Sequence, residues 1–78
     1  MVREHDRVVL TADQQGEGLE AGDVGTVVHV YAGRNAYEVE FVTLSGATAS
    51  IATLSADQIR AVTERDLVHV RELAPATR

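Results

Sequence analysis

The chain has 78 residues with no cysteine and no lysine, and its twelve acids outnumber its seven arginines to give a formal net charge of −5. This length leaves room for one hydrophobic core, without a disulfide or a thiolate metal site to support it. The acidic balance argues against nucleic-acid binding, because affinity for a phosphate backbone comes from lysine and arginine. No apolar run reaches the roughly 20 residues of a membrane span and the first residues do not form a signal peptide, so we expect a cytoplasmic protein without a membrane anchor.

Short runs rich in β-branched residues, separated by Gly, Asp, Asn and Ser, predict an all-β domain. The first strand is predicted at residues 7–11, with Val8 and Leu10 on its inner face and Val9 on its outer face. Residues 12–23, called the acidic loop below, are polar and without periodicity, which indicates a long loop anchored by its single leucine, Leu19. The acids of this loop are Asp13, Glu17, Glu20 and Asp23.

The next segments predict a β-hairpin, with a strand at 24–31, a loop at 32–35 and a returning strand at 36–41. The alternation of the returning strand places Tyr37, Val39 and Phe41 in the core, and Glu38 and Glu40 in water. In the first strand of the hairpin, the same alternation places His29 on one face with Val27 and Tyr31, half-buried.

A fourth strand is predicted at residues 48–54, with Ile51 as its clearest core residue, followed by a helical turn at 55–57 and a short fifth strand at 59–62. This order of strand, long loop, three strands, helical turn and short strand matches a small SH3-like barrel of five strands. The OB-fold is a poorer match, because its helix between the third and fourth strands has no room in residues 42–47.

The last residues form a C-terminal extension, 63–78, beyond a barrel at 1–62. After a charged break, residues 67–73 regain the character of a strand, which predicts a sixth strand that either closes the barrel edge or pairs with another chain. Residues 74–78 are expected to be disordered. A small domain without disulfides often gains stability from association, so both self-association and a bound partner stay open.

Three stretches of the sequence, DRVVLT at 6–11, GDVGTVVHVY at 22–31 and YEVEF at 37–41, resemble a family of short uncharacterised bacterial proteins. The resemblance covers roughly residues 3–62 and implies an SH3-like fold. Residues 19–27 also resemble the turn of KOW-type modules of ribosomal and transcription proteins, in which glycines let two backbone segments cross closely. Those modules usually carry basic residues around this turn, whereas this chain carries acids, which argues against RNA binding.

The sequence contains no convincing set of catalytic residues. His5, His29 and His69 lie in separate segments without the spacing that places two metal ligands on one face, so we expect no metal and no cofactor. Glu38 and Glu40 share a strand face, but alternating glutamates are typical of the solvated face of a sheet. The glycines of the acidic loop do not connect a strand to a helix, as a phosphate-binding loop would require.

These observations favour a non-catalytic module that binds a basic protein. A special case is an antitoxin or immunity protein, because members of such small families often occur beside toxin-like partners. An accessory subunit of an enzyme, like the SH3-like halves of nitrile hydratases, is the alternative. Binding is predicted through the acidic loop, the exposed sheet edge, or the extra strand at 67–73, with β-augmentation by the tail and electrostatic complementarity from the loop. The predicted partner-binding residues are Asp13, Glu17, Glu20, Asp23, Leu67, His69 and Arg71.

Overall fold

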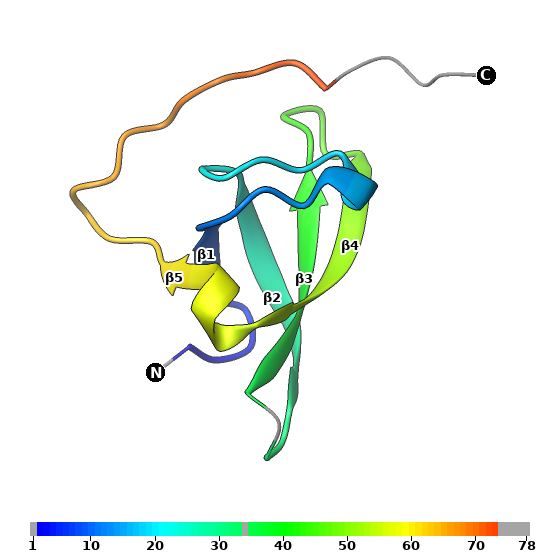
Figure 1. Ribbon diagram of the computed structural model, residues 1–78. Coiled ribbons are helices and arrows are strands. Elements are labelled where there is room, and N and C mark those ends of the chain that lie inside the picture. The colour runs from blue at the N-terminus through cyan, green and yellow to red at the C-terminus, as the bar shows by residue number, and fades with distance from the viewer. Residues whose placement is uncertain (1, 34, 74–78) are drawn as a thin grey trace.

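The computed structural model describes residues 2–33 and 35–73, and it is all-β, as the sequence predicts (Figure 1). The five strands predicted within residues 1–62 are all present, with bounds that agree to within one residue. The strands are β1 (Arg7–Leu10), β2 (Val24–Tyr31), β3 (Ala36–Val42), β4 (Thr48–Ser55) and β5 (Ile59–Ala61). Two 3-10 turns, η1 (Gln15–Glu17) and η2 (Ala56–Gln58), interrupt them. The second turn is the helical turn expected after β4, whereas η1 was not predicted.

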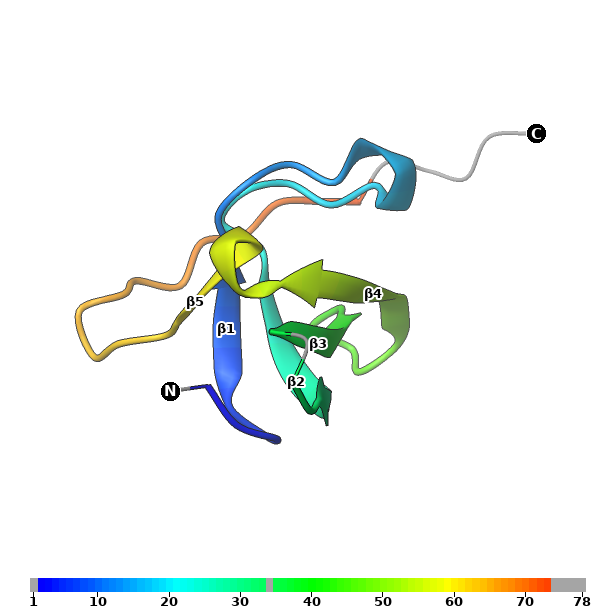
Figure 2. The ribbon, with the colours of Figure 1, turned by 60° about the horizontal axis from the view of Figure 1, so that its bottom comes forward.

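The five strands form one antiparallel sheet in the order β4-β3-β2-β1-β5, and the sheet is open, with β4 and β5 at its two edges. The β2–β3 hairpin extends away from the rest of the molecule, and the acidic loop lies at the opposite end (Figure 1). The view of Figure 2 shows the strongly twisted sheet, with β4 directed roughly crosswise to β1 and the turn η2 drawn over the end of β1. Within the described residues, no helix is long and apolar enough to cross a membrane.

The core lies against one face of this sheet and holds the predicted inner residues. Val8, Leu10, Val27 and Val39 are at most 1% exposed, because β-branched and aliphatic side chains on alternate positions all point to the same side. The other members of the core are Leu19, Tyr37, Phe41, Ala52, Leu54 and Ile59. The loop leucine is therefore the anchor that the sequence predicts.

The sequence predicts the wrong face of β4 for the core. Ile51 is 52% exposed, while Ala52 and Leu54 are buried. The register explains the difference, since Ile51 pairs with Glu40 on the outer face and Leu54 pairs with Tyr37 on the inner face. The pairing partner, and not the size of the side chain, decides which residues of an edge strand reach the core.

The prediction that His29 shares the face of Val27 was also wrong. The β2–β3 register shifts between Val27 and His29, which leaves Val28 as an extra residue. Val27 is fully buried, but the bulge turns His29 to the outer face, where its ring meets Tyr31 edge-on at 4.6 Å between centroids. A bulge shifts every following side chain to the other face, and the alternation of the sequence alone does not reveal it.

Gly25 lies where the chain has no room for a side chain. A Cβ atom built on Gly25 would lie 2.6 Å from a methyl of Val39 and 2.9 Å from the ring of Phe41. The side chains of Val39 and Phe41 on β3 thus lie so close to the backbone of β2 that only hydrogen fits at this position.

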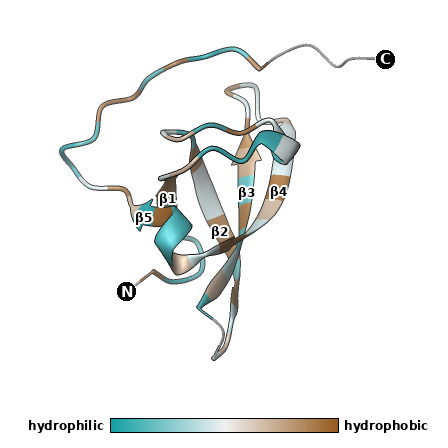
Figure 3. Cartoon of the chain, in the orientation of Figure 1, coloured by the Kyte–Doolittle hydropathy of each residue, from teal (hydrophilic) through white to brown (hydrophobic). Residues whose placement is uncertain are grey.

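The predicted sixth strand is not formed. Val62 still donates to the carbonyl of Arg7 on β1 at 3.1 Å, and a turn follows in which the amide of Asp66 donates to the carbonyl of Thr63 at 3.1 Å. Residues 67–73 then run on without strand pairing, and residues 74–78 lie outside the described residues. We call residues 63–73 the C-terminal segment. It leaves β5, arches over one end of the sheet and comes back beside the acidic loop (Figures 1 and 2). Its side chains alternate between hydrophilic and hydrophobic without entering the core (Figure 3).

Candidate binding surface at the acidic loop

The acidic loop is folded by its own backbone. The amide of Gln14 donates to the carbonyl of Leu19 at 2.9 Å, and the amide of Leu19 donates back at 3.1 Å. This small bridge encloses η1, which ends at Gly18 in the left-handed conformation with φ 71°. Glycine adopts that conformation without strain, and the resulting turn leaves the carbonyl oxygen of Gly18 available to a donor.

Three of the four loop acids brace the loop or its neighbours. Asp13 accepts a hydrogen bond from the amide of Ala21 at 2.8 Å, and Asp23 accepts one from the amide of Glu20 at 2.9 Å. Glu17 accepts a hydrogen bond from the hydroxyl of Ser50 on β4 at 2.9 Å. These bonds occupy only part of each carboxylate, because one carboxylate accepts as many as four donors.

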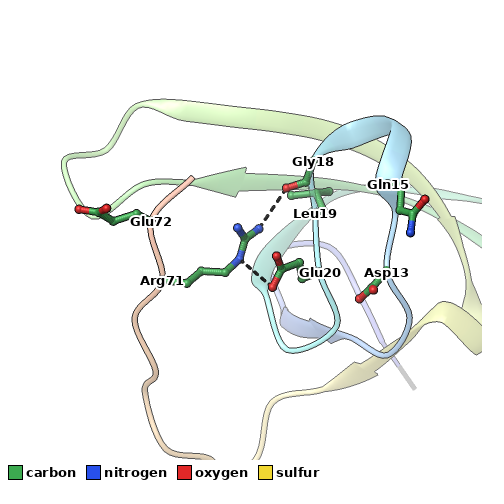
Figure 4. A pocket seen from close by; sticks show the side chains of 7 residues that line it. All are labelled: Asp13, Gln15, Gly18, Leu19, Glu20, Arg71 and Glu72. Atoms are coloured by element: carbon green, nitrogen blue, oxygen red, sulfur yellow. Dashed lines mark hydrogen bonds and ion pairs between the residues drawn. The ribbon is translucent and has the colours of Figure 1, made fainter. Parts of the chain in front are cut away.

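The remaining acceptors of the loop hold an arginine of the C-terminal segment. The guanidinium of Arg71 donates to both carboxylate oxygens of Asp23, from Nε at 2.8 Å and from Nη2 at 2.6 Å. Nη2 also donates to the carbonyl of Gly18 at 3.1 Å, and the nearest oxygen of Glu20 lies 3.7 Å from Nε (Figure 4). The loop therefore binds a planar guanidinium through paired acceptors, which is the geometry of a strong charge-assisted contact.

The electrostatics of this contact follow from its geometry. The hydrogen bonds from Arg71 hold the pKa of Asp23 below its usual range, against a partial burial that acts in the opposite direction. The pKa of Arg71 is raised, first by the hydrogen bonds to Asp23 and then by the charges of Asp23, Glu20 and Asp13. With 18% and 26% of their side chains exposed, Asp23 and Arg71 are both more shielded from water than Glu20 at 62%.

Two open cavities lie on either side of the Arg71 side chain. The first measures about 390 Å³ and is bounded by the loop and by Arg71 and Glu72 (Figure 4). The second measures about 380 Å³ and lies between the loop, the start of the C-terminal segment and Val9. Val9, expected on the outer face, is 8% exposed and lines this second cavity. The predicted residues that line one or both cavities are Asp13, Glu20, Asp23, Leu67, His69 and Arg71.

The structure thus gathers six of the seven predicted partner-binding residues at one place. Glu17 is the exception, since it turns toward β4. The sequence did not indicate that the acids and Arg71 would contact each other, because Arg71 and Asp23 are 48 positions apart. Nor did any sequence signal indicate the carbonyl of Gly18 as part of the surface.

A second arginine–carboxylate contact fixes the start of the C-terminal segment. The carboxylate of Asp66 accepts two hydrogen bonds from Arg60 of β5, at 3.0 and 2.7 Å, and one from the amide of Thr63 at 2.7 Å. These bonds hold the pKa of Asp66 well below its usual range, Arg60 having the largest effect. Sequence reasoning missed both partners, although a threonine three residues before an aspartate is a usual sign of a turn closed by side chains.

The carboxylates of β3 lie on the outer face of the sheet, as predicted. Glu38 accepts hydrogen bonds from the hydroxyls of Tyr31 at 2.7 Å and Thr53 at 3.1 Å, and Glu40 accepts one from Thr48 at 2.6 Å. The Tyr31 hydroxyl lowers the pKa of Glu38, and Glu38 in turn raises the pKa of Tyr31. These are cross-strand contacts of the kind that stabilise a sheet.

The described residues contain no group of three or more His, Cys, Asp or Glu that could hold a metal ion. His29 lies 3.9 Å from the carboxylate of Glu4 on the outer face, far along the sheet from the acidic loop. His5 has a positive φ of 75° in the turn before β1, where its amide donates to the carbonyl of Val27 at 2.7 Å.

The fold and this surface define a small all-β domain whose long acidic loop holds an arginine side chain. Residues 4–61 match a family model described as a domain of unknown function (DUF4926), and the chain belongs to this family. The match ends at the last residue of β5, so it includes the acidic loop but not Arg71. No curated protein and no solved structure matches the chain significantly.

Proposed function

We propose that this chain is a non-catalytic protein-binding module that docks on a basic protein through the acidic loop. The observation that carries the proposal is the contact between the loop and Arg71, in which Asp23 and the carbonyl of Gly18 accept three hydrogen bonds from one guanidinium. A loop that holds an arginine from its own extended segment offers the same acceptors to an arginine of a partner.

The charge of the chain supports this proposal. A formal net charge of −5 attracts a basic partner over a longer range than any single contact, and it raises the rate of encounter more than the affinity. When the partner is a basic enzyme, covering its site with acids neutralises it, which is the role of an antitoxin or immunity protein. The module needs no chemistry of its own for that role.

We further propose that the fold is an open form of the SH3-like barrel. Its support is the order of elements, with a long loop after β1, three consecutive strands, the turn η2 and the short β5, which pairs with β1. In such a scaffold, loops at one end of a rigid sheet are the usual place of recognition. The acidic loop occupies one end here (Figure 1).

The test is capture of a partner from the native cell with the full chain, compared with Glu20→Gln. Glu20 is mostly exposed and approaches Arg71 without a hydrogen bond, so its replacement removes a loop charge and leaves the bracing bonds intact. The matched control is Glu64→Gln, which removes an exposed charge outside the loop. We expect a basic protein whose affinity falls several-fold in the loop variant alone and weakens with added salt. An acidic partner, or equal capture by all three proteins, would contradict the proposal.

A further inference from the structure

The C-terminal segment is attached to the loop by one side chain. Within the described part of the chain, Arg71 supplies every hydrogen bond between residues 67–73 and the rest of the domain, and no backbone group of these residues bonds to the domain. Upstream, Arg60 and Asp66 fix the chain at the end of β5. The segment is therefore a tether with a fixed start and a single contact at the loop.

The apolar side chains of the tether do not strengthen that contact. Leu67 is 94% exposed, Val68 91% and Val70 66%. Burial of apolar surface is the main source of stability in a docked segment, and these residues contribute almost none. The attachment of the tether therefore depends on one side chain alone, and an external competitor with a similar guanidinium can displace it.

The acceptors of the loop distinguish arginine from lysine. Asp23 accepts from two different nitrogens of Arg71, and the carbonyl of Gly18 accepts from one of these nitrogens. A guanidinium presents its donors in a fixed planar fork, whereas an ammonium group is a point charge with no such plane. The geometry selects an arginine that arrives on an extended chain.

We propose that Arg71 is a displaceable internal occupant of the acidic loop, and that the partner presents an arginine in an extended segment with aliphatic neighbours, the chemistry of residues 67–73 themselves. This inference rests on the proposed function and names its partner chemistry and its regulation. While Arg71 is bound, the loop is closed to the partner. Release of Arg71 opens the loop, while the leucine and valines of the tether are exposed in either state.

The first test measures the occupancy of Arg71 in the full chain. Trypsin must take the guanidinium of an arginine into its own pocket, so it competes with the loop for Arg71. We expect Asp23→Asn to speed cleavage after Arg71 several-fold, with cleavage after Arg65 unchanged. Arg65 is an internal control, since an acid also follows it and, within the described residues, its side chain makes no hydrogen bond with the loop. Equal acceleration at both arginines would indicate loosening of the whole segment and would overturn the inference.

The second test supplies the segment from outside. The probe is a synthetic peptide that copies residues 66–73, titrated into Arg71→Gln and into the wild-type chain with detection by nuclear magnetic resonance. We expect about tenfold weaker binding to the wild type, which corresponds to a loop occupied by Arg71 in roughly nine-tenths of the molecules. A peptide with lysine in place of the arginine should bind the variant several-fold more weakly. Equal binding of the peptide to both proteins, or no binding to either, overturns the internal-occupant inference.

The two proposals fail in different ways. If the peptide binds neither protein while Glu20→Gln still loses a basic partner, the loop binds proteins but Arg71 does not regulate it. If the peptide binds only Arg71→Gln and capture yields no basic partner, the contact is an internal one and the proposed function falls.

Discussion

Different interactions hold the β2–β3–β4 sheet and the C-terminal segment in place, apolar burial in the first and one polar contact in the second. The sheet places Val27, Val39 and Leu54 in the core at 1% exposure or less, whereas residues 67–70 of the segment remain mostly in water and one arginine fixes the far end. Apolar burial gives a structure that any mutation of the packing disturbs. A polar contact at the surface can be replaced by an equivalent contact from another molecule. The molecule therefore combines a rigid scaffold with one reversible attachment, which is the arrangement a regulated binding surface requires.

The sharpest test of the scaffold is a pair of substitutions on β4. Leu54→Ala should cost about 2–5 kcal/mol, because it removes a side chain that is 1% exposed and leaves a cavity. Ile51→Ala, at a side chain 52% exposed, should cost well under half as much. Chemical denaturation of both variants measures the two losses. Similar losses would mean that the outer face of β4 is covered, and the register described above would then be incomplete.

The close contact between Gly25 of β2 and the side chains of β3 allows a second test. Gly25→Ala places a methyl group 2.6 Å from Val39, and overpacking of this kind typically costs about 1–3 kcal/mol. Gly16→Ala is the matched control, since a Cβ there meets no atom within 4 Å and the backbone is not left-handed. Its effect should be small and stabilising. Thermal unfolding measures the stability of both variants. A loss in Gly25→Ala alone means that this position requires glycine, whereas no loss means that the neighbouring side chains move to accept the methyl group.

On the side of the segment, Arg71→Gln should lower global stability by about 1.4 kcal/mol, which corresponds to a loop that Arg71 occupies in roughly nine-tenths of the molecules. Because Arg71 lowers the pKa of Asp23 in the folded state, the contact contributes stability above the ordinary pKa of aspartate and loses it as the pH falls through the lowered pKa. The two proteins should thus differ most at neutral pH and converge in acid. The low pKa of Asp66 is common to both and cancels from the difference. A gap that widens on acidification would contradict the assigned contact.

The smallest expected effect is on the outer face of the sheet. Glu38→Gln weakens the hydrogen bond that is the main cause of the raised pKa of Tyr31 and also removes the charge of Glu38, so the phenol should titrate at a lower pH than in the wild type. Ultraviolet absorbance of tyrosinate follows the change, and Tyr31→Phe identifies which of the two tyrosines is observed. If the titration does not move, the hydroxyl of Tyr31 does not donate to Glu38 in solution.

Local pattern was enough to predict much of the fold. The strands, the turn after β4, the inward set of Tyr37, Val39 and Phe41, and the anchor at Leu19 all follow from alternation and turn residues, which depend on neighbours a few positions away. The acids of the loop and the arginine of the segment could also be named as surface candidates. Each of these predictions needed only the identity and spacing of nearby residues.

The tertiary structure decided what depends on distant partners. The exposure of Ile51 follows from its pairing with Glu40, and the outward turn of His29 follows from a bulge against β3. The residues 67–73 have the composition of a strand, but neither edge of the sheet pairs with them in the described residues, and they extend instead. The contact of Arg71 with Asp23 joins positions 48 apart. Composition determines which groups can meet, but only the folded chain brings them within hydrogen-bonding distance.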